Sequence, residues 1–495
     1  MKFIGLRLCE HDSNISYSDD ITVKYYKSER DFQIKHHGFN NLTDWKFLIK
    51  KWKINPKDID AIGIVLDCFR HKQIHCNEQK LFEIIDIDEL KSLGFECPIF
   101  RLDHHLAHSL SIWTLDVPTT KNFVFDGFGD DRIFHSIFTD QRILSCPIKE
   151  NHLSFGQSLA KFGVEIGLDG NDLDHAGKIM ALKGYGKLRT KNISYQKYSL
   201  DNLDDLWNTH QNFSIHDNFE EICCHVNNCH TKTEKIFAEH FSKYSEKNDV
   251  IGYTGGVAQN TVINSKLKKI RKNLQVPPHC NDEGLSLGII EFLRQYFDQE
   301  KFNIDNFPFI QDDESPESRV SKNTIKKTAE FLAQGKIVGW YQGHGEIGPR
   351  ALGNRSILMN PMVTDGKEIL NKKVKHREFF RPFGASILED KTTKYFDFEG
   401  KSEYMLYVMD VLDKKSFPAI THVDGTCRIQ TVSKNLTTYH SLISEFEKIT
   451  GLPMLLNTSL NNGGKPICGH IKDALKLFSE SNLDILVIGD EIYLK

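Results

Sequence analysis

The sequence predicts an α/β protein of two domains, and three observations lead to this fold class. Short apolar runs alternate with helical stretches through the first part of the chain, an acidic segment interrupts them, and a new helix and strand follow. The 495 residues are 39% hydrophobic and 26% charged, a composition typical of a folded protein with room for two or three domains. We expect domains at residues 1–313 and 321–495, each large enough to bury a core.

Three buried strands are predicted in the first domain. Residues 62–66, 123–125 and 249–253 are short runs of mainly aliphatic and aromatic residues. Helical stretches separate them along the chain, and such alternation is typical of an α/β sheet.

The second domain is predicted to begin after residues 311–318, which are acidic, contain proline and include no apolar residue that needs burial. This composition predicts a linker. Apolar positions within 325–332 then share one helical face, and 336–341 follows as a strand. The runs 483–488 and 491–494 flank a two-residue turn, which predicts a terminal β-hairpin.

The charge balance excludes several classes of protein. Lys+Arg and Asp+Glu give 63 − 67 = −4, so no strong field attracts a nucleic acid. The amino terminus meets charge too early for a signal peptide, and no apolar stretch approaches the ~20 residues that span a bilayer. We expect a cytoplasmic protein without a nucleic-acid or membrane partner.

Eleven cysteines, an odd number, indicate mostly reduced thiols. The segment 223–230 gathers three of them with two histidines, but zinc sites usually draw on two separated ligand pairs. We expect buried thiols there, with a metal site as the alternative.

A second candidate for metal binding lies near residue 104. His104 and His108 have the i, i+4 spacing that sets two imidazoles on one face of a helix, and Asp126 follows the strand at 123–125 in a glycine-rich run. Two imidazoles with carboxylates suit Fe²⁺, Zn²⁺ or Mn²⁺. An exposed helix face is the alternative. The similar pair His71/His75 has no acidic partner and is assigned to the surface.

Two further segments of the first domain are candidate binding elements. The strand at 249–253 runs into Gly255 and Gly256 before a helix, and free backbone N–H groups at such a point bind anions. A simple tight turn is the alternative. Asp282, in the run 281–284, is either a metal ligand or a helix cap.

The second domain carries candidate anion sites. Residues 343–348 fit G-x-G-x-x-G, but no long helix follows, which excludes a dinucleotide fold. Arg350 and Arg355 can still hold phosphate. The run 371–384 interleaves cations with aromatic residues, which favours a cleft for a planar anionic ligand over a solvated face.

Two polar runs in the second domain, 421–431 and 456–464, are predicted to be binding loops. From these residues alone, the sequence predicts a two-domain transferase that depends on a metal and a nucleotide.

Taken in order, the motifs resemble those of the NodU/CmcH family of O-carbamoyltransferases, which modify antibiotics, nodulation factors and other glycosides. The resemblance spans nearly the whole chain. The matching runs are His11-Asp12-Ser13, 103–108, 126–129, 255–260, 281–284, 346–356, 381–383, 422–426 and 457–459.

The resemblance implies an N-terminal domain of the actin/sugar-kinase (ASKHA) type and a C-terminal YrdC-like domain. It further implies that the carbamoyl group of carbamoyl phosphate passes, through a carbamoyl-adenylate made with ATP and Mg²⁺, to a hydroxyl of a small molecule. Fe²⁺ is the expected resident metal, with Zn²⁺ or Mn²⁺ as alternatives.

The resemblance also implies roles for particular residues. The metal ligands would be His104, His108, Asp126 and Asp282, and the adenylate in the N-terminal domain would contact Gly127, Gly255, Gly256, Gln259 and Asn260. Carbamoyl phosphate and ATP in the C-terminal domain would contact Arg350, Asn354, Arg355, Lys375, Arg377, Arg381, Arg428, Asn457 and Ser459.

The implied chemistry needs these residue types. A carbamate is a poor electrophile, and adenylation supplies a leaving group whose phosphate charge must be neutralised by cations. The acceptor hydroxyl needs a general base, for which we propose His11 oriented by Asp12. No cysteine or serine nucleophile is required.

Two other functions stay open. A tRNA-modifying threonylcarbamoyl transferase is one, although a net charge of −4 supplies no basic stripe for RNA. A non-catalytic nucleotide-binding module is the other. Only His344 supports it, because relatives usually carry Arg or Lys at that position.

Overall fold

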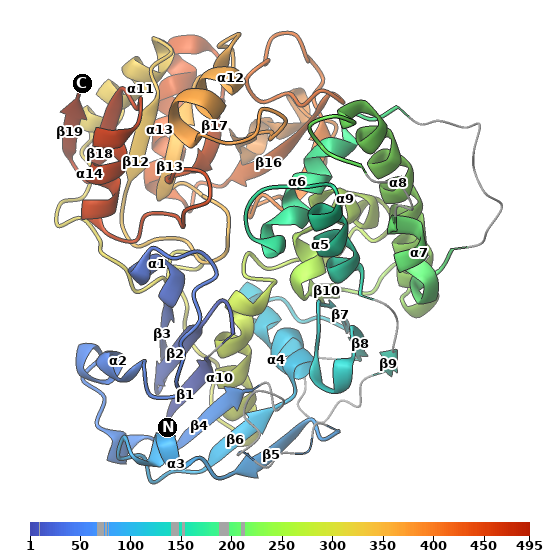
Figure 1. The fold of residues 1–495 in the computed structure, drawn as a ribbon. Coiled ribbons are helices and arrows are strands. Elements are labelled where there is room, and N and C mark those ends of the chain that lie inside the picture. Colours follow the sequence, from blue (N-terminus) through green and yellow to red (C-terminus); the bar gives the residue numbers. More distant parts are fainter. Residues whose placement is uncertain are drawn as a thin grey trace. The chain divides into compact units, whose positions relative to one another are not determined.

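The computed structural model describes residues 1–8, 10–66, 74, 77, 79–139, 148–150, 154–187, 198–208 and 213–495. These residues form three β-sheets with helices, which confirms the predicted α/β class (Figure 1). They divide into two compact units, namely 1–156 with 242–259 and 270–312, and 157–241 with 260–269 and 313–495. The contiguous domains expected at 1–313 and 321–495 stay a prediction, because these units are assembled from discontinuous segments.

The first sheet of the first unit has six strands in the order β3-β2-β1-β4-β6-β5. The pairs β1/β2, β2/β3 and β5/β6 are antiparallel, whereas β1/β4 and β4/β6 are parallel. The strand predicted at 62–66 is confirmed as β4. The strands are β1 (Lys2–Arg7), β2 (Asn14–Asp19), β3 (Thr22–Lys27), β4 (Ala61–Val65), β5 (Phe82–Ile85) and β6 (Ile99–Leu102).

The second sheet of this unit has five strands in the order β11-β10-β7-β8-β9. Strand β10 pairs parallel with β7 and β11, and the pairs β7/β8 and β8/β9 are antiparallel. The strands predicted at 123–125 and 249–253 are confirmed as β7 and β10. The strands are β7 (Lys121–Phe125), β8 (His135–Phe138), β9 (Ile148–Glu150), β10 (Ile251–Thr254) and β11 (Leu274–Gln275).

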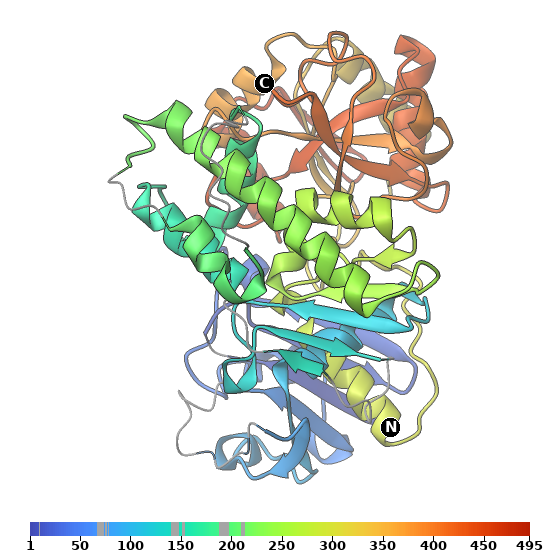
Figure 2. The same cartoon turned by 90° about the vertical axis from the view of Figure 1, so that its right-hand side faces the viewer.

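Two helices fill the layer between these sheets (Figure 2). Helix α10 (Leu285–Tyr296) packs on β1, β2 and β4, and α4 (His104–Ser111) packs on β7, β8 and β10. The two helices also pack on each other, and Gly288 permits the contact because a Cβ there would lie 1.8 Å from the Ala107 carbonyl oxygen. Gly5 has a similar role on β1, where a Cβ would lie 2.4 Å from the Ser286 carbonyl oxygen.

The remaining helical elements of the first unit are short. They are α1 (Ser28–Phe32), α2 (Lys46–Lys51), α3 (Asp88–Lys91), η1 (Pro56–Asp58), η2 (Ile112–Leu115), η3 (Asp130–Arg132), η7 (Gly256–Gln259) and η8 (Asp282–Gly284). Among the described residues, no helix of either unit is both long and apolar enough to cross a bilayer.

The second unit contains a group of helices from the middle of the chain. Helix α8 is the longest of them and carries the cysteine-rich segment 223–230. The two ends of this group extend by a few residues into the first unit. Its members are α5 (Phe155–Glu165), η4 (Asp172–Asp174), α6 (His175–Lys183), η6 (Leu200–Asn202), α7 (Leu203–Trp207), α8 (Phe219–Tyr244) and α9 (Thr261–Ile270).

An eight-stranded sheet in the order β15-β16-β14-β17-β13-β12-β18-β19 forms the rest of the second unit. The helix, strand and hairpin predicted at its start and end are confirmed as α11, β12 and β18/β19. The strands are β12 (Val338–Tyr341), β13 (Arg355–Met359), β14 (Gly384–Leu388), β15 (Tyr407–Asp410), β16 (Thr426–Val432), β17 (Met454–Ser459), β18 (Ile485–Ile488) and β19 (Glu491–Leu494). The helices are α11 (Lys322–Ala333), α12 (Gly366–Leu370), α13 (Thr437–Thr450) and α14 (Ile471–Glu480), with shorter turns η9 (Asn371–Lys375) and η10 (Glu389–Lys394).

The acidic segment at 311–318 contains the boundary between the two units, which falls after Asp312, but parts of it are buried. Gln311 is buried, and the Asp313 carboxylate lies 3.0 Å from Nη2 of the fully buried Arg355. The carboxylate therefore compensates a guanidinium inside the second unit. This pairing was not visible in the sequence, because the two residues are far apart along the chain.

Gly288→Ala should weaken the contact between α4 and α10. The added methyl group overlaps the Ala107 carbonyl, so we expect a loss of about 2 kcal/mol or more in the free energy of unfolding, measured by urea denaturation. Gly177→Ala, in the interior of α6, is the matched control, because no atom lies within 4 Å of its Cβ position. That variant should be neutral or up to ~1 kcal/mol more stable. Equal stability of the two variants would contradict the packing argument.

Candidate metal centre and anion sites

Four buried side chains from three parts of the first unit form a candidate metal centre. Asp103 caps α4 by accepting a hydrogen bond from the Leu106 backbone N–H at 2.9 Å, and the helix then directs His104 and His108 to one face. Asp126 follows β7, and Asp282 opens η8 just before α10. The predicted ligand pair on a helix and the aspartate after a strand thus lie together.

The imidazoles and carboxylates of this group are within contact distance. His104 Nε2 lies 3.0 Å from Asp126 Oδ2 and 3.4 Å from Asp282 Oδ1. His108 Nε2 lies 3.7 Å from Asp126 Oδ2 and 3.3 Å from Asp282 Oδ1. One candidate ligand atom from each of the four residues lies within 4.8 Å of the others. Asp282 therefore lies where it could serve as a metal ligand, and this role stays a prediction.

The group has the properties expected of a divalent cation site. All four residues are buried, and His108 Nε2 contacts the carboxylates of Asp126 and Asp282. Buried imidazoles and carboxylates that face one another are stabilised further when a cation lies between them. Two nitrogen and two oxygen donors suit Fe²⁺, Zn²⁺ or Mn²⁺. The residues fit the predicted metal without selecting one of these ions.

The charges in this group are strongly coupled. Burial alone would lower the pKa of His104, but the carboxylates of Asp282 and Asp126 raise it well above its usual value. Burial would raise the pKa of both carboxyls, yet the two imidazoles hold them well below the usual range. The two aspartates are therefore ionised, as metal ligands must be.

Neighbouring groups orient both carboxylates. The Gly256 backbone N–H donates to Asp126 Oδ1 at 2.7 Å, and Arg7 Nη2 lies 3.0 Å from Asp282 Oδ2. Gly255 has a φ of 88°. A Cβ at that position would lie 2.0 Å from the Phe125 carbonyl oxygen. Only glycine fits there, so the paired glycines bring their backbone against the end of β7.

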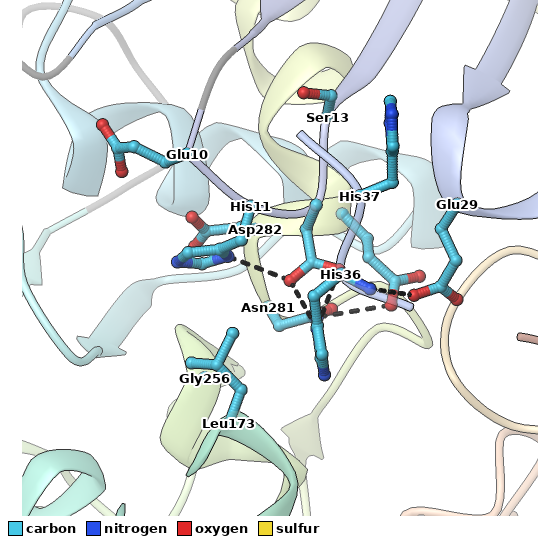
Figure 3. Close-up of polar contacts among 12 residues, drawn as sticks. Glu10, His11, Ser13, Glu29, His36, His37, Leu173, Gly256, Asn281 and Asp282 are labelled. Carbon is cyan, nitrogen blue, oxygen red and sulfur yellow. Dashed lines mark hydrogen bonds and ion pairs between the residues drawn. The ribbon is translucent and has the colours of Figure 1, made fainter. Parts of the chain in front are cut away.

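His11 and Asp12, the proposed base and its orienting group, also lie in the first unit (Figure 3). His11 Nδ1 is 3.0 Å from Asp12 Oδ2, which leaves the opposite ring nitrogen for a substrate. The His11 side chain is 36% exposed, whereas that of Asp12 is 4% exposed. Burial lowers the pKa of His11, but the hydrogen bond that His11 donates to Asp12 and the charge of Asp282 raise it overall.

The predicted adenylate-binding residues do not all have the same surroundings. Gly127 and Gly256 flank Asp126, and the position of a Cβ on Gly127 has no atom within 4 Å. Gln259 ends η7 in the first unit. Asn260 belongs to the second unit, where its Oδ1 accepts from the Ile263 backbone N–H at 3.1 Å and its Nδ2 lies 3.1 Å from His230 Nε2.

Four of the predicted phosphate ligands in the second unit form a group of like charges. Burial, followed by the charges of Arg381, Arg428 and Arg350, lowers the pKa of Arg377 well below its usual value. Burial and the charges of Arg350 and Arg381 also lower the pKa of Arg428 well below its usual value. Arg428 Nε is buried without a hydrogen-bond partner among the described residues. Such a concentration of positive charge is suited to an anion.

Arg355 and Lys375 have partners within the protein instead. Arg355 donates to the carbonyl oxygens of Gln342, Glu314 and Gly343 at 2.6, 2.9 and 3.0 Å, and its guanidinium stacks 3.6 Å from the Tyr341 ring centroid. Lys375 Nζ donates to the carbonyl oxygens of Ser459 and Asn461, both at 2.8 Å. These contacts indicate that both cations hold loops in place.

The remaining polar candidates of this unit also have internal contacts. Asn457 Nδ2 donates to Ser386 Oγ at 2.9 Å, Asn354 Nδ2 to the His344 carbonyl oxygen at 2.8 Å, and Ser459 Oγ to Asn461 Oδ1 at 2.7 Å. The four arginines therefore influence one another through their charges. The two asparagines and Ser459 instead form hydrogen bonds with other groups of the protein.

A family model described as the carbamoyltransferase C-terminus matches residues 329–495. The 3'-hydroxymethylcephem-O-carbamoyltransferase of Amycolatopsis lactamdurans is 30% identical over 273 residues, which cover 53% of this chain and 52% of the relative. The chain belongs to the carbamoyltransferase family. The resemblance to NodU/CmcH proteins is thereby confirmed, whereas nothing in these matches identifies the C-terminal domain as YrdC-like.

Other members of the carbamoyltransferase family and a more distant structure complete the comparison. Nodulation protein NolNO of Sinorhizobium fredii is 36% identical over 269 residues, which cover 50% of this chain and 40% of the relative. The chain thus spans about half the length of the curated relatives it matches. An activator of 2-hydroxyisocaproyl-CoA dehydratase from Clostridium difficile covers 61% of this chain with 12% identity and a TM-score of 0.35, too low to support an argument.

The cysteine-rich segment of this carbamoyltransferase-family chain lies on α8 as buried thiols. Burial raises the pKa of Cys229 to about 12, so the thiol stays protonated, and its Sγ lies 3.0 Å from the Leu206 carbonyl oxygen. A metal would require thiolates. The expectation of buried thiols agrees with this geometry, and the His71/His75 pair lies outside the described residues.

Sequence reasoning missed three charged residues around Asp12, namely Lys27, Glu29 and His36. Lys27 Nζ lies 3.7 Å from Asp12 Oδ1 and 3.0 Å from Glu29 Oε1, and His36 Nδ1 lies 3.1 Å from Asp12 Oδ2. No regular spacing links these residues to His11. The one available signal is the pair of adjacent histidines just before Gly38.

Replacing a ligand of the metal centre should remove bound metal. We expect Asp126→Asn or His108→Ala to lower the affinity for Fe²⁺ or Zn²⁺ by more than about 100-fold, because a buried charge or donor is lost. Elemental analysis of purified protein and titration of chelated protein with the ion measure this effect.

His105→Asn is the matched control for the metal prediction. His105 lies on α4 between the two candidate ligands, but its Nδ1 is 2.7 Å from Ser136 Oγ and burial lowers its pKa to about 3. The control should keep its metal. If the ligand variants retain as much metal as this control, the assignment of the centre is wrong.

Proposed function

We propose that this chain is an ATP-dependent O-carbamoyltransferase that transfers the carbamoyl group of carbamoyl phosphate to a hydroxyl of a small molecule. The observation that carries the proposal is the buried group of two histidines and two aspartates, in the same unit as the His11–Asp12 pair and in a chain of the carbamoyltransferase family. The relative from Amycolatopsis lactamdurans is named for such a transfer to a cephem hydroxyl.

We further infer that the first unit is of the actin/sugar-kinase type and the C-terminal part is YrdC-like. The order β3-β2-β1-β4-β6, with three antiparallel strands followed by parallel ones, supports the first assignment. The glycines that approach β7 support it as well, because such backbone N–H groups suit a nucleotide phosphate. For the C-terminal part, the arginine group beside a mixed sheet supports a site for a phosphate-rich substrate.

The first reaction is proposed to occur at the arginine group. Water releases phosphate from carbamoyl phosphate to leave carbamate, and a carbamate oxygen then attacks the α-phosphorus of Mg²⁺-bound ATP. The new P–O bond forms as the bond to pyrophosphate breaks, which gives carbamoyl-adenylate. Arg350, Arg377, Arg381 and Arg428 would neutralise charge on the phosphates as it moves to the leaving group. Lys375 and Arg355 would keep the surrounding loops in position.

The second reaction is proposed to use the first unit. His11 would accept the proton of the acceptor hydroxyl at Nε2 while the hydroxyl oxygen attacks the carbamoyl carbon, and the bond from that carbon to the AMP oxygen then breaks. Asp12 would stabilise the imidazolium through Nδ1. His104, His108, Asp126 and Asp282 would hold a divalent metal, which when bound supplies positive charge for a phosphate group.

Two rival functions are less well supported. A tRNA threonylcarbamoyl transferase would need a surface for a polyanion, and the net charge of −4 does not favour one. A non-catalytic nucleotide-binding module rests on His344, whose side chain is 54% exposed with Nδ1 3.6 Å from Asp313 Oδ1. An exposed imidazole beside a carboxylate can still carry positive charge, so this residue is a weak reason to exclude catalysis.

The proposed first reaction predicts that pyrophosphate release from Mg²⁺–ATP depends on carbamoyl phosphate. Arg428→Met should raise the KM for carbamoyl phosphate or ATP about tenfold or more, since a charge-assisted contact to phosphate is lost. A coupled assay for pyrophosphate measures both effects. Arg319→Met is the control, because Arg319 is exposed on the second unit and belongs to no predicted site.

Pyrophosphate release at the same rate without carbamoyl phosphate would exclude the proposed activity. Complete absence of release under all conditions would favour the non-catalytic module. Binding of tRNA that weakens steeply with salt would favour the tRNA-modifying rival.

The proposed second reaction predicts that His11→Ala separates the two steps. The variant should release pyrophosphate as the unaltered protein does, because its substitution lies outside the arginine group. It should fail to carbamoylate any hydroxyl compound that the unaltered protein modifies in a mass-spectrometric screen of glycosides and antibiotic precursors. Carbamoylation that persists in His11→Ala would remove the general base from this mechanism.

A further inference from the structure

The Asp12 carboxylate is shared by two imidazoles. His11 Nδ1 lies 3.0 Å and His36 Nδ1 3.1 Å from the same oxygen, Oδ2, and His36 Nδ1 also lies 3.3 Å from Oδ1. Figure 3 labels His11 and His36, and its dashed lines mark hydrogen bonds and ion pairs among the residues drawn. When the carboxylate is ionised, it accepts the Nδ1–H of each ring, which leaves Nε2 of each neutral ring as the basic atom.

The backbone around this contact is built to bring the two histidines together. The Ser13 N–H donates to the His37 carbonyl oxygen at 2.9 Å, and the Phe39 N–H donates to Ser13 Oγ at 3.0 Å. A Cβ on Gly38 would lie 2.2 Å from the Glu10 carbonyl oxygen, so glycine is needed for this approach.

Two of these residues have an unfavourable backbone conformation. Asp12 and His36 have φ values of 54° and 53°, in the left-handed region that is uncommon outside glycine, although Asn, Asp and His adopt it more often than other residues do. Each such residue costs about 1 kcal/mol or more, and such costs concentrate at functional sites. The surrounding packing maintains the conformation in which both rings reach Asp12.

Asp12, Glu29 and His36 together have the composition of a second metal site, but a protein cation already lies among them. Lys27 Nζ is 2.7 Å from Glu283 Oε1, 3.0 Å from Glu29 Oε1 and 3.7 Å from Asp12 Oδ1, with all these side chains buried. These carboxylates raise the pKa of Lys27 despite burial, so the ammonium stays charged. The ammonium therefore supplies the positive charge that a metal would otherwise supply.

We propose that His36 is a positioning residue for His11, which shares the Asp12 carboxylate with it and so keeps His11 Nδ1 protonated and Nε2 free to accept a proton. The inference deepens the proposed function, because it assumes that His11 acts as the base. Lys27 and His36 together keep Asp12 ionised and fixed. His11 shares with His36 the Oδ2 atom that orients it.

The sharing has a consequence for the basicity of His11. A carboxylate that faced His11 alone would stabilise the imidazolium more strongly, and a base that is already protonated cannot accept the hydroxyl proton. Charged groups that act on this pair include Asp282, Arg7 and Glu10 on His11, and Lys27 and Glu29 on Asp12, while Glu283 pairs with Lys27. Among the contacts described for Asp12, His36 donates to the same Oδ2 atom as His11 in a hydrogen bond of similar length.

The roles of the two histidines are distinguishable by exposure. The His11 side chain is 36% exposed and that of His36 is 17% exposed, so a substrate hydroxyl reaches His11 more readily. If the assignment were reversed, with His36 as the base, replacing His36 would abolish transfer and replacing His11 would only weaken it.

The experiment compares His36→Gly with His36→Asn in the full chain. Both residues tolerate the positive φ, but only asparagine keeps an N–H donor near the position of Nδ1. The readout is the pH dependence of ethoxycarbonylation of His11 by diethyl pyrocarbonate, which attacks neutral imidazole. The tryptic peptide of residues 8–24 contains His11 as its one histidine, so mass spectrometry reports this ring alone.

In His36→Gly we expect the apparent pKa of His11 to rise by about half a unit or more, and in His36→Asn to stay close to that of the unaltered protein. A merely structural role for His36 would not move this value. An unchanged pKa in a folded His36→Gly, or an equal rise in both variants, would overturn the proposal.

Two further measurements separate this inference from the function on which it rests. Pyrophosphate release that depends on carbamoyl phosphate should be the same in both variants and the unaltered protein, and its absence in all three would reject the proposed function alone. The content of bound Fe²⁺ or Zn²⁺ should also be equal. A stoichiometric loss of metal in His36→Gly would show that the group around Asp12 is a second metal site and would overturn the positioning role.

Discussion

The candidate centre depends on the close contact between α4 and α10. Gly288 lets α10 approach the Ala107 carbonyl, and this contact places η8, which precedes α10, beside the histidines of α4. Asp282 thereby meets His104 and His108 although the sequence separates them by more than 170 residues. The two sheets hold each helix from the outside, so the positions of the ligands follow from packing at the middle of the unit.

In two places in the first unit, a single carboxylate contacts several positively charged or proton-donating groups. Asp282 contacts two imidazoles and Arg7, and Asp12 contacts two imidazoles and Lys27. Buried carboxylates would otherwise take up protons, because burial disfavours their charge. Cations from neighbouring strands keep both carboxylates ionised. The second unit has the reverse arrangement at its arginine group, where the positive charges of neighbouring arginines lower the pKa of Arg377 and Arg428.

Local patterns allowed the strands, α11, the terminal hairpin and three of the four candidate ligand positions to be predicted. The i, i+4 spacing of His104 and His108 and the position of Asp126 after a strand are visible in one sequence, because both depend on local geometry. For Asp282, whose contacts are long-range, the sequence left a metal ligand and a helix cap as alternatives, and the resemblance favoured the ligand. Burial is not visible in the sequence, so the internal carbonyl contacts of Arg355 and Lys375 could not be predicted, and their role as phosphate ligands stays a prediction. His36 was missed because a loop contact brings it to Asp12.

The acidic segment before the C-terminal sheet affects where a stable C-terminal fragment of this chain can begin. A fragment that begins at residue 321 would lack Asp313 and Glu314, and the guanidinium of Arg355 would remain buried without its carboxylate. Loss of one partner from a buried ion pair typically costs about 3–5 kcal/mol, a large part of the stability of a domain. Protein engineers who exchange C-terminal regions among relatives should therefore place the junction before Asp313, so that the arginine and its counterion are inherited together.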